Sequence, residues 1–253
     1  MLVAATALTA SAQERKVIGD TDKNIEWVAK RGWNIRLSAG LNVGGTAPMP
    51  LPREIRSINS YNPGLNFAIE GSVPKSFGSS PWGLRAGLRF ERKGMSTDAD
   101  TKNYYMEAWN TDGSGKVVGS WTGKVKTKVD NTYITLPVLV TYSLDRRILF
   151  SAGPYISYLL DGEFSGQAYD GYIRDQNPTG ERADVTRAEY DFANDISSWQ
   201  WGVQAGCEYR AYRHLALFAN IQWGVNSIFP DDYTSVTFAL YPIYGTLGFT
   251  YLF

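Results

Sequence analysis

The 253-residue chain is electrically balanced, with 25 Lys and Arg residues against 25 Asp and Glu residues. A formal net charge of zero excludes the overall basic field typical of nucleic-acid-binding proteins, so we expect no nucleic-acid partner. A single cysteine, Cys207, excludes an intramolecular disulfide and a cysteine-based metal cluster. Aromatic residues make up 14% of the chain and glycine occurs 25 times, which favours strands and turns over helices.

The N-terminus has the pattern of an export signal. The apolar stretch LVAATALTA leads into Ala10-Ser11-Ala12, an A-x-A cleavage pattern, and the residues after it are polar. We expect residues 1–12 to be the remnant of a signal peptide, 13–32 a periplasmic segment and 33–253 one β-barrel domain. The alternative for the first segment is a short buried helix. No stretch of about 18 apolar residues occurs, which argues against an ordinary transmembrane helix.

Eight segments alternate between apolar and polar residues with a period of two, the pattern of a strand with one apolar face. They are nine to thirteen residues long, against about 9–11 residues for a tilted strand that crosses a bilayer. Ordinary globular strands are shorter, at about 5–6 residues. In chain order the predicted strands are 33–43, 65–73, 82–91, 133–142, 148–160, 199–210, 215–226 and 241–253.

The connections between these segments alternate in length. Those after the second, fourth and sixth segments are short, and those after the first, third, fifth and seventh are long. Outer-membrane barrels have short turns on the periplasmic side and long loops outside. In the second long connection, 92–131, alternating lysines in KVKTKVD predict a hairpin that rises above the membrane.

Aromatic residues gather at the strand ends on the apolar face, as in the two girdles of a membrane barrel. The predicted periplasmic girdle contains Trp33, Trp82, Tyr142, Tyr209, Tyr251 and Phe253, and the outer girdle contains Tyr158, Trp199, Trp201, Trp223 and Tyr241. A soluble barrel or a lipocalin-like cup is the alternative, but its core would hold the largest aromatics in the middle. We therefore predict an all-β fold, an eight-stranded antiparallel up-and-down transmembrane β-barrel with four long extracellular loops, in the outer membrane of a Gram-negative bacterium.

The polar face predicts a lumen filled by paired charges. The residues expected to point inward are Arg36, Glu70, Arg85, Arg89, Glu91, Glu208 and Arg210. Buried charges must be paired, so an ionic network is the expected arrangement, and a selective ion path is the alternative. Pro137 and Pro154 lie inside predicted strands and cannot donate to the ladder, so we expect a bulge at each.

Four stretches carry a resemblance to a known family: AGLNVGG, YITLPVLVTYSL, ILFSAGPYISYLLDG and the terminal YPIYGTLGFTYLF. Together they resemble the PorT-like outer-membrane β-barrel family, over residues 33–253. The resemblance implies the fold and the location, and it carries over no catalytic residue. The founding member is associated with a protein secretion and maturation system. Phe253 at the end of the chain resembles the signal by which barrel-assembly machinery recognises its substrates.

No constellation of residues points to catalysis. The one histidine, His214, lies in a short turn on the predicted periplasmic rim, away from any serine and carboxylate pair, so we expect no enzyme. We expect no cofactor and no metal, because ordered calcium motifs are absent. The expected partners are outer-membrane lipid and lipopolysaccharide, the barrel-assembly machinery through the C-terminal strand, and an unknown protein or glycan at the loops. The expected role is structural or interaction-based, and the alternatives are a small porin or uptake protein, or an accessory component of a protein secretion machine.

Overall fold

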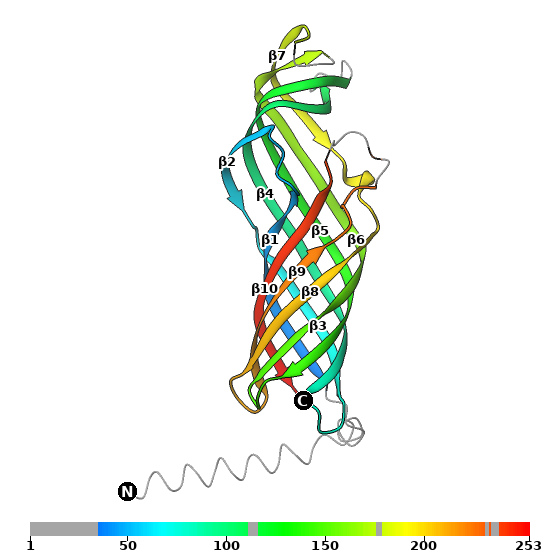
Figure 1. Cartoon of the computed structure of the whole chain (residues 1–253). Coiled ribbons are helices and arrows are strands. Elements are labelled where there is room, and N and C mark those ends of the chain that lie inside the picture. Colours follow the sequence, from blue (N-terminus) through cyan, green and yellow to red (C-terminus); the bar gives the residue numbers. More distant parts are fainter. Residues whose placement is uncertain (1–34, 111–115, 176–178, 231–232, 234–237) are drawn as a thin grey trace, which may run out of the picture.

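The computed structural model describes the chain except for residues 1–34, 111–115, 176–178, 231–232 and 234–237 (Figure 1). The described residues form one antiparallel sheet of ten strands and a short 3-10 helix, η1 (Ala193–Asp195). The strands are β1 (Arg36–Pro48), β2 (Ile55–Asn62), β3 (Asn66–Ser76), β4 (Trp82–Asn110), β5 (Lys116–Ser143), β6 (Ile148–Asp175), β7 (Arg182–Asp191), β8 (Trp199–Arg210), β9 (Leu215–Gly224) and β10 (Leu240–Leu252). Among these residues no helix is long and apolar enough to span a membrane.

Eight of the ten strands pair in a closed ring. The pairings run from β1 through β3, β4, β5, β6, β8, β9 and β10, and β10 pairs with β1 again. The closing pair extends from Arg36 opposite Leu252 to Pro48 opposite Leu240, so the C-terminal strand lies against the first one. The short turns and the C-terminus lie at one end of the ring, at the bottom of Figure 1, and the longest strands extend past the opposite end.

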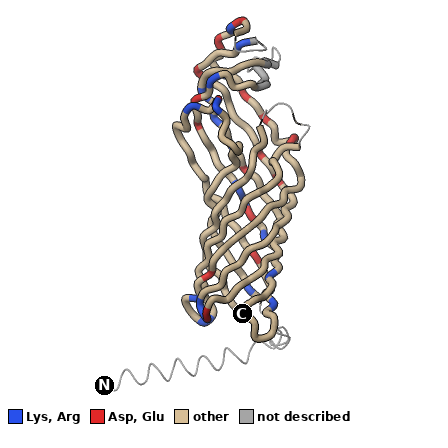
Figure 2. The backbone as a smooth tube through the Cα atoms, in the orientation of Figure 1, with Lys and Arg blue, Asp and Glu red and all other residues tan. Residues whose placement is uncertain are grey.

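The ring is polar inside and apolar outside. Along β1, Arg36 and Asn42 are buried, whereas Leu37 and Leu41 are about half exposed on the outer surface. This assignment of faces agrees with the alternation in the sequence. Aliphatic side chains form the middle of the outer surface, including Leu37, Leu41, Ile69, Leu84, Leu88, Leu136, Val138, Ile156, Val203, Ile221 and Leu247. Figure 2 shows that charged residues gather near the two ends of the structure and are sparse between them.

The long connections contain more sheet than we expected. Strands β2 and β7 lie in segments predicted to be loops, so the strand count is ten and not eight. Strand β2 pairs with β4, and β7 pairs with β4 and β6, outside the ring. The β4–β5 hairpin continues to the pair Trp109–Lys116, which agrees with the hairpin predicted from the alternating lysines. We call these added parts the extension: residues 94–110 of β4, 116–130 of β5 and 163–175 of β6, with β2 and β7.

The extension has the opposite arrangement to the ring: the interior of the extension is apolar. Val129 of β5 faces Met95 of β4 on one side and Phe164 of β6 on the other. These residues begin a cluster whose buried members are Trp121, Val129, Phe164, Ala168, Ile173, Ala188, Tyr190, Ile196, Ile228, Phe229 and Leu240. Their burial explains why segments with a polar sequence fold as strands: the sheet here covers a hydrophobic core as in a soluble domain.

The expected bulges at Pro137 and Pro154 are wrong. On β5 and β6 the register is the same before and after the prolines, with Leu136 opposite Ile156 and Val140 opposite Ala152. Pro154 also keeps its place opposite Val203 of β8. The missing proline N–H groups are therefore accommodated without an inserted residue.

Candidate functional site

The lumen near the short-turn end holds two arginines around one glutamate. Glu208 of β8 accepts a hydrogen bond from Nη2 of Arg36 of β1. Nη1 of Arg85, on β4, lies 3.5 Å from the other oxygen of this carboxylate, and Nη2 of Arg85 donates to Ser151 Oγ at 3.1 Å. All four side chains are buried, so the carboxylate offsets part of the positive charge that the ring encloses.

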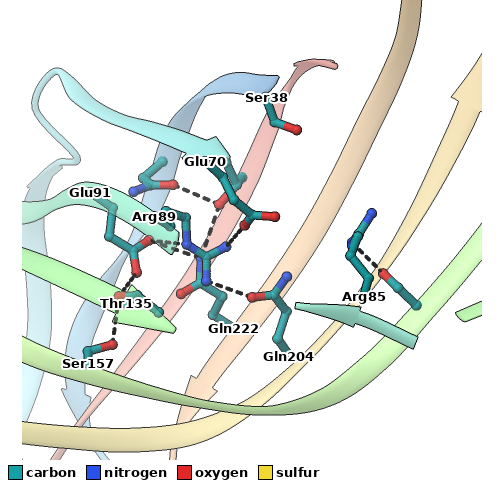
Figure 3. Close-up of polar contacts among 12 residues, drawn as sticks. Ser38, Glu70, Arg85, Arg89, Glu91, Thr135, Ser157, Gln204 and Gln222 are labelled. Carbon is teal, nitrogen blue, oxygen red and sulfur yellow. Dashed lines mark hydrogen bonds and ion pairs between the residues drawn. The ribbon is translucent and has the colours of Figure 1, made fainter. Parts of the chain in front are cut away.

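A second cluster lies further along the lumen, centred on Glu91 of β4 (Figure 3). Glu91 has an exposed fraction of 0%. Its Oε2 lies 3.4 Å from Nε of Arg89, and its Oε1 lies 3.2 Å from Nζ of Lys93. Thr135 donates to Glu91 Oε1 at 2.7 Å, and Gln222 donates to Oε2 at 3.2 Å. The carboxylate is thus held by groups from β4, β5 and β9.

Arg89 links this cluster to the rest of the lumen. Its Nη1 lies 3.4 Å from Oε2 of Glu70 on β3, and its Nη2 donates to Oε1 of Gln204 on β8 at 2.7 Å. Figure 3 shows the guanidinium between these partners, with side chains from opposite walls of the ring meeting at its centre. A charge-assisted network of this kind is stronger than its neutral equivalent.

Lys93 ends the charged part of the lumen. Its exposed fraction is 2%, and its Nζ lies 5.4, 5.2 and 5.9 Å from the ring centroids of Tyr133, Tyr155 and Tyr244. These tyrosines come from β5, β6 and β10, so the four side chains cross the ring as a layer, which we call the Lys93 layer. Cations are attracted to aromatic faces at such distances. The layer separates the charged lumen from the apolar core of the extension.

Little space remains between the charged side chains. The cavity among Ser38, Glu70, Arg85, Arg89 and their neighbours measures about 10 Å³. One water molecule needs about 10–15 Å³ by this measure. This part of the lumen therefore has room for about one isolated water, whereas a wider hollow of about 360 Å³ opens at the short-turn end, where Arg36 and Glu208 line it.

Six of the seven residues predicted to line the lumen are buried there, and Arg210 is not. Arg210, the last residue of β8, is exposed and lines the hollow at the short-turn end together with Arg36 and Glu208. At the strand end its guanidinium can stay hydrated at the mouth of the ring. Lys93 was missed, although it continues the inward series Arg85, Arg89, Glu91 at the same period of two. The signal was present, but the predicted strand ended too early.

The predicted girdle residues lie on the outer surface. At the short-turn end, Trp82 contacts Tyr142 with ring centroids 4.8 Å apart, and Tyr251 contacts Phe253 at 4.8 Å. At the other end, Tyr158 contacts Trp199 at 5.0 Å. Most are exposed by 42–56%, namely Trp82, Tyr158, Trp199, Trp201, Tyr209, Trp223, Tyr251 and Phe253, whereas Tyr142 and Tyr241 are half-buried. Trp33 lies outside the described residues, as do the predicted segments 1–12 and 13–32.

The outer face of the extension carries charges of both signs. Nζ of Lys128 lies 2.7 Å from Oε2 of Glu163, and Nζ of Lys124 lies 3.3 Å from Oδ2 of Asp170. The Tyr169 hydroxyl donates to Asp98, which raises the pKa of Tyr169 to about 12. A shallow groove runs across β5, β6 and β7 and is lined by Lys126, Lys128, Ser165, Gly166, Gln167, Arg187, Glu189, Tyr190 and Asp191.

The residues that could have carried chemistry do not come together. Within the described residues no three His, Cys, Asp or Glu side chains are grouped so that they could hold a metal ion. His214 uses Nδ1 in a 2.7 Å hydrogen bond with the carbonyl oxygen of Leu252, and its ring stacks on Tyr251. Asp145 accepts hydrogen bonds from the N–H groups of Arg147 and Ile148, which lower the pKa of Asp145 and hold the β5–β6 turn.

The family is decided by comparison with protein-family models. The model described as "Outer membrane protein beta-barrel domain" matches residues 11–230, which is most of the chain. The chain belongs to this family. The protein is therefore a β-barrel protein of the Gram-negative outer membrane. The match does not separate a PorT-like group from the rest of the family, so that finer assignment is a proposal.

Solved structures of small outer-membrane proteins are similar to this chain at low sequence identity. Ail, the attachment invasion locus protein of Yersinia pestis, is 9% identical with a TM-score of 0.39, over 87% of this chain and 97% of Ail. Neisserial surface protein A is 9% identical with a TM-score of 0.32, over 88% and 97%. OprG of Pseudomonas aeruginosa is 11% identical with a TM-score of 0.28, over 87% and 95%. A search of curated proteins gave no match.

Proposed function

We propose that the protein is a monomeric, non-conducting, eight-stranded transmembrane barrel that presents its extension outside the cell as a binding surface. The filled lumen carries this proposal. Glu91, Arg89 and Lys93 are buried and paired at the centre of the ring, and the Lys93 layer crosses it. A pore would need an open polar path in this place.

The outer surface of the ring supports a membrane-spanning orientation. On β4 the outward residues are apolar or aromatic from Trp82 to Phe90, and Arg92 then pairs outward with Asp130. Nine residues at about 3.3 Å per residue extend roughly 26 Å along a strand, enough for most of the apolar band of about 25 Å in such barrels even when tilted. Outer-membrane lipid and lipopolysaccharide then contact the girdles, and the extension stands in water beyond them.

The groove across β5, β6 and β7 is the best candidate for the binding surface. Lys126 and Lys128 on β5 face Arg187, Glu189 and Asp191 on β7 across it. Charges of both signs beside hydroxyl and amide groups suit a polar partner, either a protein or a glycan. We propose that this surface binds a partner and has no enzymatic activity. A role as an accessory component of a protein secretion machine is a special case of this proposal.

Two measurements test the proposal. Protein reconstituted in a planar bilayer is expected to give no unitary conductance, whereas steady current steps whose ion selectivity changes in Lys93→Gln would support the small porin or uptake protein instead. Affinity purification from native outer membranes is expected to recover a partner that the double variant Lys126→Glu, Lys128→Glu loses at least tenfold. Lys102→Glu makes the same kind of charge change outside the groove and is expected to retain the partner. Equal recovery with all three proteins would contradict a binding role for the groove.

A further inference from the structure

A cavity of about 120 Å³ lies within the extension, next to the Lys93 layer. Met95 lines it and follows Lys93 by two residues, so it is the next side chain on the inner face of β4. The walls come from β1, β2, β4, β5, β6, β7 and β10, with Phe192 and Phe238 from the connections. The cavity thus lies on the extension side of the Lys93 layer.

Aromatic rings form much of the wall. Tyr190 lies 5.4 Å from Phe192 and 6.4 Å from Phe164, measured between ring centroids, and Tyr104 lies 5.6 Å from Phe238. The complete lining is Thr46, Pro48, Ile55, Met95, Thr97, Ala99, Thr101, Tyr104, Val125, Thr127, Phe164, Tyr190, Phe192, Phe238 and Leu240. None of these side chains carries a charge at neutral pH.

Several polar groups of the wall already have partners in the protein. The Tyr190 hydroxyl lies 2.7 Å from Thr127 Oγ1 and donates to the carbonyl oxygen of Lys126 at 3.0 Å. Thr101 Oγ1 donates to the carbonyl oxygen of Gly123 at 3.1 Å. A buried water is held by two to four polar partners, whereas an apolar cavity of comparable size stays dry and accepts a molecule such as benzene. The wall therefore favours an apolar occupant over water.

The position of the cavity identifies the source of that occupant. At this level Arg92 and Asp130 form an outward ion pair, with Arg92 Nε donating to Asp130 Oδ1 at 2.6 Å, so the outer surface has left the apolar band. In the membrane orientation proposed above, on which this step rests, the acyl chains of the surrounding lipid end below this pair. The occupant is then a free molecule from the medium, and a charged one is disfavoured because burial of an unpaired charge is costly.

We infer that the cavity is a binding site for a small neutral apolar molecule, of the size of one aromatic ring or a short alkyl chain. The inference goes beyond the interaction role proposed above, which uses the outer face of the extension. Either can therefore fail without the other.

Methyl NMR of methionine tests the site directly. The protein, labelled with ¹³C at its methionine methyl groups, is titrated with fluorobenzene in detergent micelles, with 4-fluorobenzoate as the charged counterpart. Met95 lines the cavity, and Met49 is 45% exposed outside it and reports general effects of the solute. We expect a saturable shift of the Met95 methyl resonance with fluorobenzene, no comparable shift of Met49, and an affinity at least tenfold weaker for 4-fluorobenzoate.

Cavity-filling substitutions provide the controls. Ala99→Phe places a ring in the cavity and is expected to weaken fluorobenzene binding at least tenfold. Ala86→Phe adds the same ring on the lipid-facing side of the same strand and is expected to leave binding within twofold of the parent. If Ala99→Phe does not fold, Thr97→Leu fills less of the space and is expected to weaken binding at least threefold.

Two outcomes would overturn the inference. One is a shift that grows linearly with fluorobenzene and is equal at Met95 and Met49, since that reports partition into the micelle. The other is a saturable shift that persists unchanged in the folded cavity-filling variant. Neither result depends on a partner of the outer groove, so the interaction role would stand or fall by its own experiments.

Discussion

The substitution Glu91→Gln should destabilise the barrel far more than the loss of an exposed ion pair. Glutamine keeps the shape of the side chain and removes its charge. Arg89 retains Glu70 at 3.4 Å, but Lys93 loses the carboxylate at 3.2 Å and keeps only its tyrosine neighbours. The substitution therefore leaves a buried ammonium group without a counter-charge.

The size of the effect follows from the distances. At an effective dielectric constant of about 20, unit charges roughly 3.3 Å apart interact by ~5 kcal/mol. Glu91 has two such partners, Arg89 at 3.4 Å and Lys93 at 3.2 Å, and both attractions are lost in Glu91→Gln. The neutral glutamine no longer carries the desolvation cost of a buried carboxylate, which offsets much of the lost attraction. Removal of one partner of a buried pair costs about 3–5 kcal/mol, so we expect a loss of ~4 kcal/mol in the free energy of unfolding. Adding Lys93→Met to Glu91→Gln removes the unpaired ammonium and should recover about 2 kcal/mol of that loss.

Equilibrium unfolding in urea, with the protein in lipid vesicles and tryptophan fluorescence as the signal, measures these values. The matched control is Glu189→Gln on the extension, which breaks a pair with Arg187 in which both side chains are 56% exposed. An exposed pair of this kind contributes less than about 1 kcal/mol. If Glu91→Gln lies within 1 kcal/mol of the parent, or if Lys93→Met adds its own full penalty to it, the buried network does not stabilise the barrel in the way described.

Three further predictions concern the outer surface, the extension and the wall of the ring. Leu88→Arg places a charge in the middle of the apolar band and should cost about 2–4 kcal/mol in the same unfolding assay, whereas Ile58→Arg, equally exposed on the extension, should cost less than about 1 kcal/mol. Burial raises the pKa of Tyr190 above its ordinary value of 10, so its contribution to stability is complete below pH 10 and is lost as the pH rises through the higher folded value. Absorbance of tyrosinate should therefore show a late step well above pH 10 that is smaller by one tyrosine in Tyr190→Phe, because burial also raises the pKa of other tyrosines such as Tyr104. A Cβ at Gly202 would collide with backbone of the neighbouring strand, so Gly202→Ala should cost about 1–3 kcal/mol, against little change for Gly71→Ala, where the space is open.

Each of these has a clear contrary result. Equal stability of the two arginine variants would mean that Leu88 does not face lipid. A single tyrosinate step near pH 10 would mean that water reaches Tyr190, and an unchanged Gly202→Ala would mean that the strands can separate there at little cost.

The ring could be predicted from the sequence because its two faces touch different media. Leu84, Leu88 and Phe90 alternate with Arg85 and Arg89, and the structure places the first set outside and the second inside. Successive side chains of a strand point to opposite faces, so the face of each residue can be predicted from the local sequence alone. Ring closure between β1 and β10 also followed, because an even number of up-and-down strands makes the first and last strands antiparallel, so that they can pair and close the ring.

The extension and the Lys93 layer could not be predicted in the same way. The stretch from Met95 to Lys102 reads as polar, and its inward face is recognised only when Val129 and Phe164 are known to lie beside it. The aromatic layer needs Tyr133, Tyr155 and Tyr244, which are far apart in the sequence and meet because of the strand register. Period and composition record which face a residue takes, whereas height along the barrel is set by pairing between distant segments.

The reversal of polarity between the ring and the extension disfavours a wrong register in the long β4–β5 hairpin during assembly. If these strands paired with a shift of one residue, every side chain of the shifted strand would turn to the opposite face. In the ring such a shift would move polar groups such as Thr135 into lipid. In the extension the same shift would expose Val129 to water. Both changes result from the same register shift, so the shift is unfavourable in the lipid and in the water at the same time. Only one register of β4 against β5 therefore places apolar side chains against lipid in the ring and polar side chains against water in the extension.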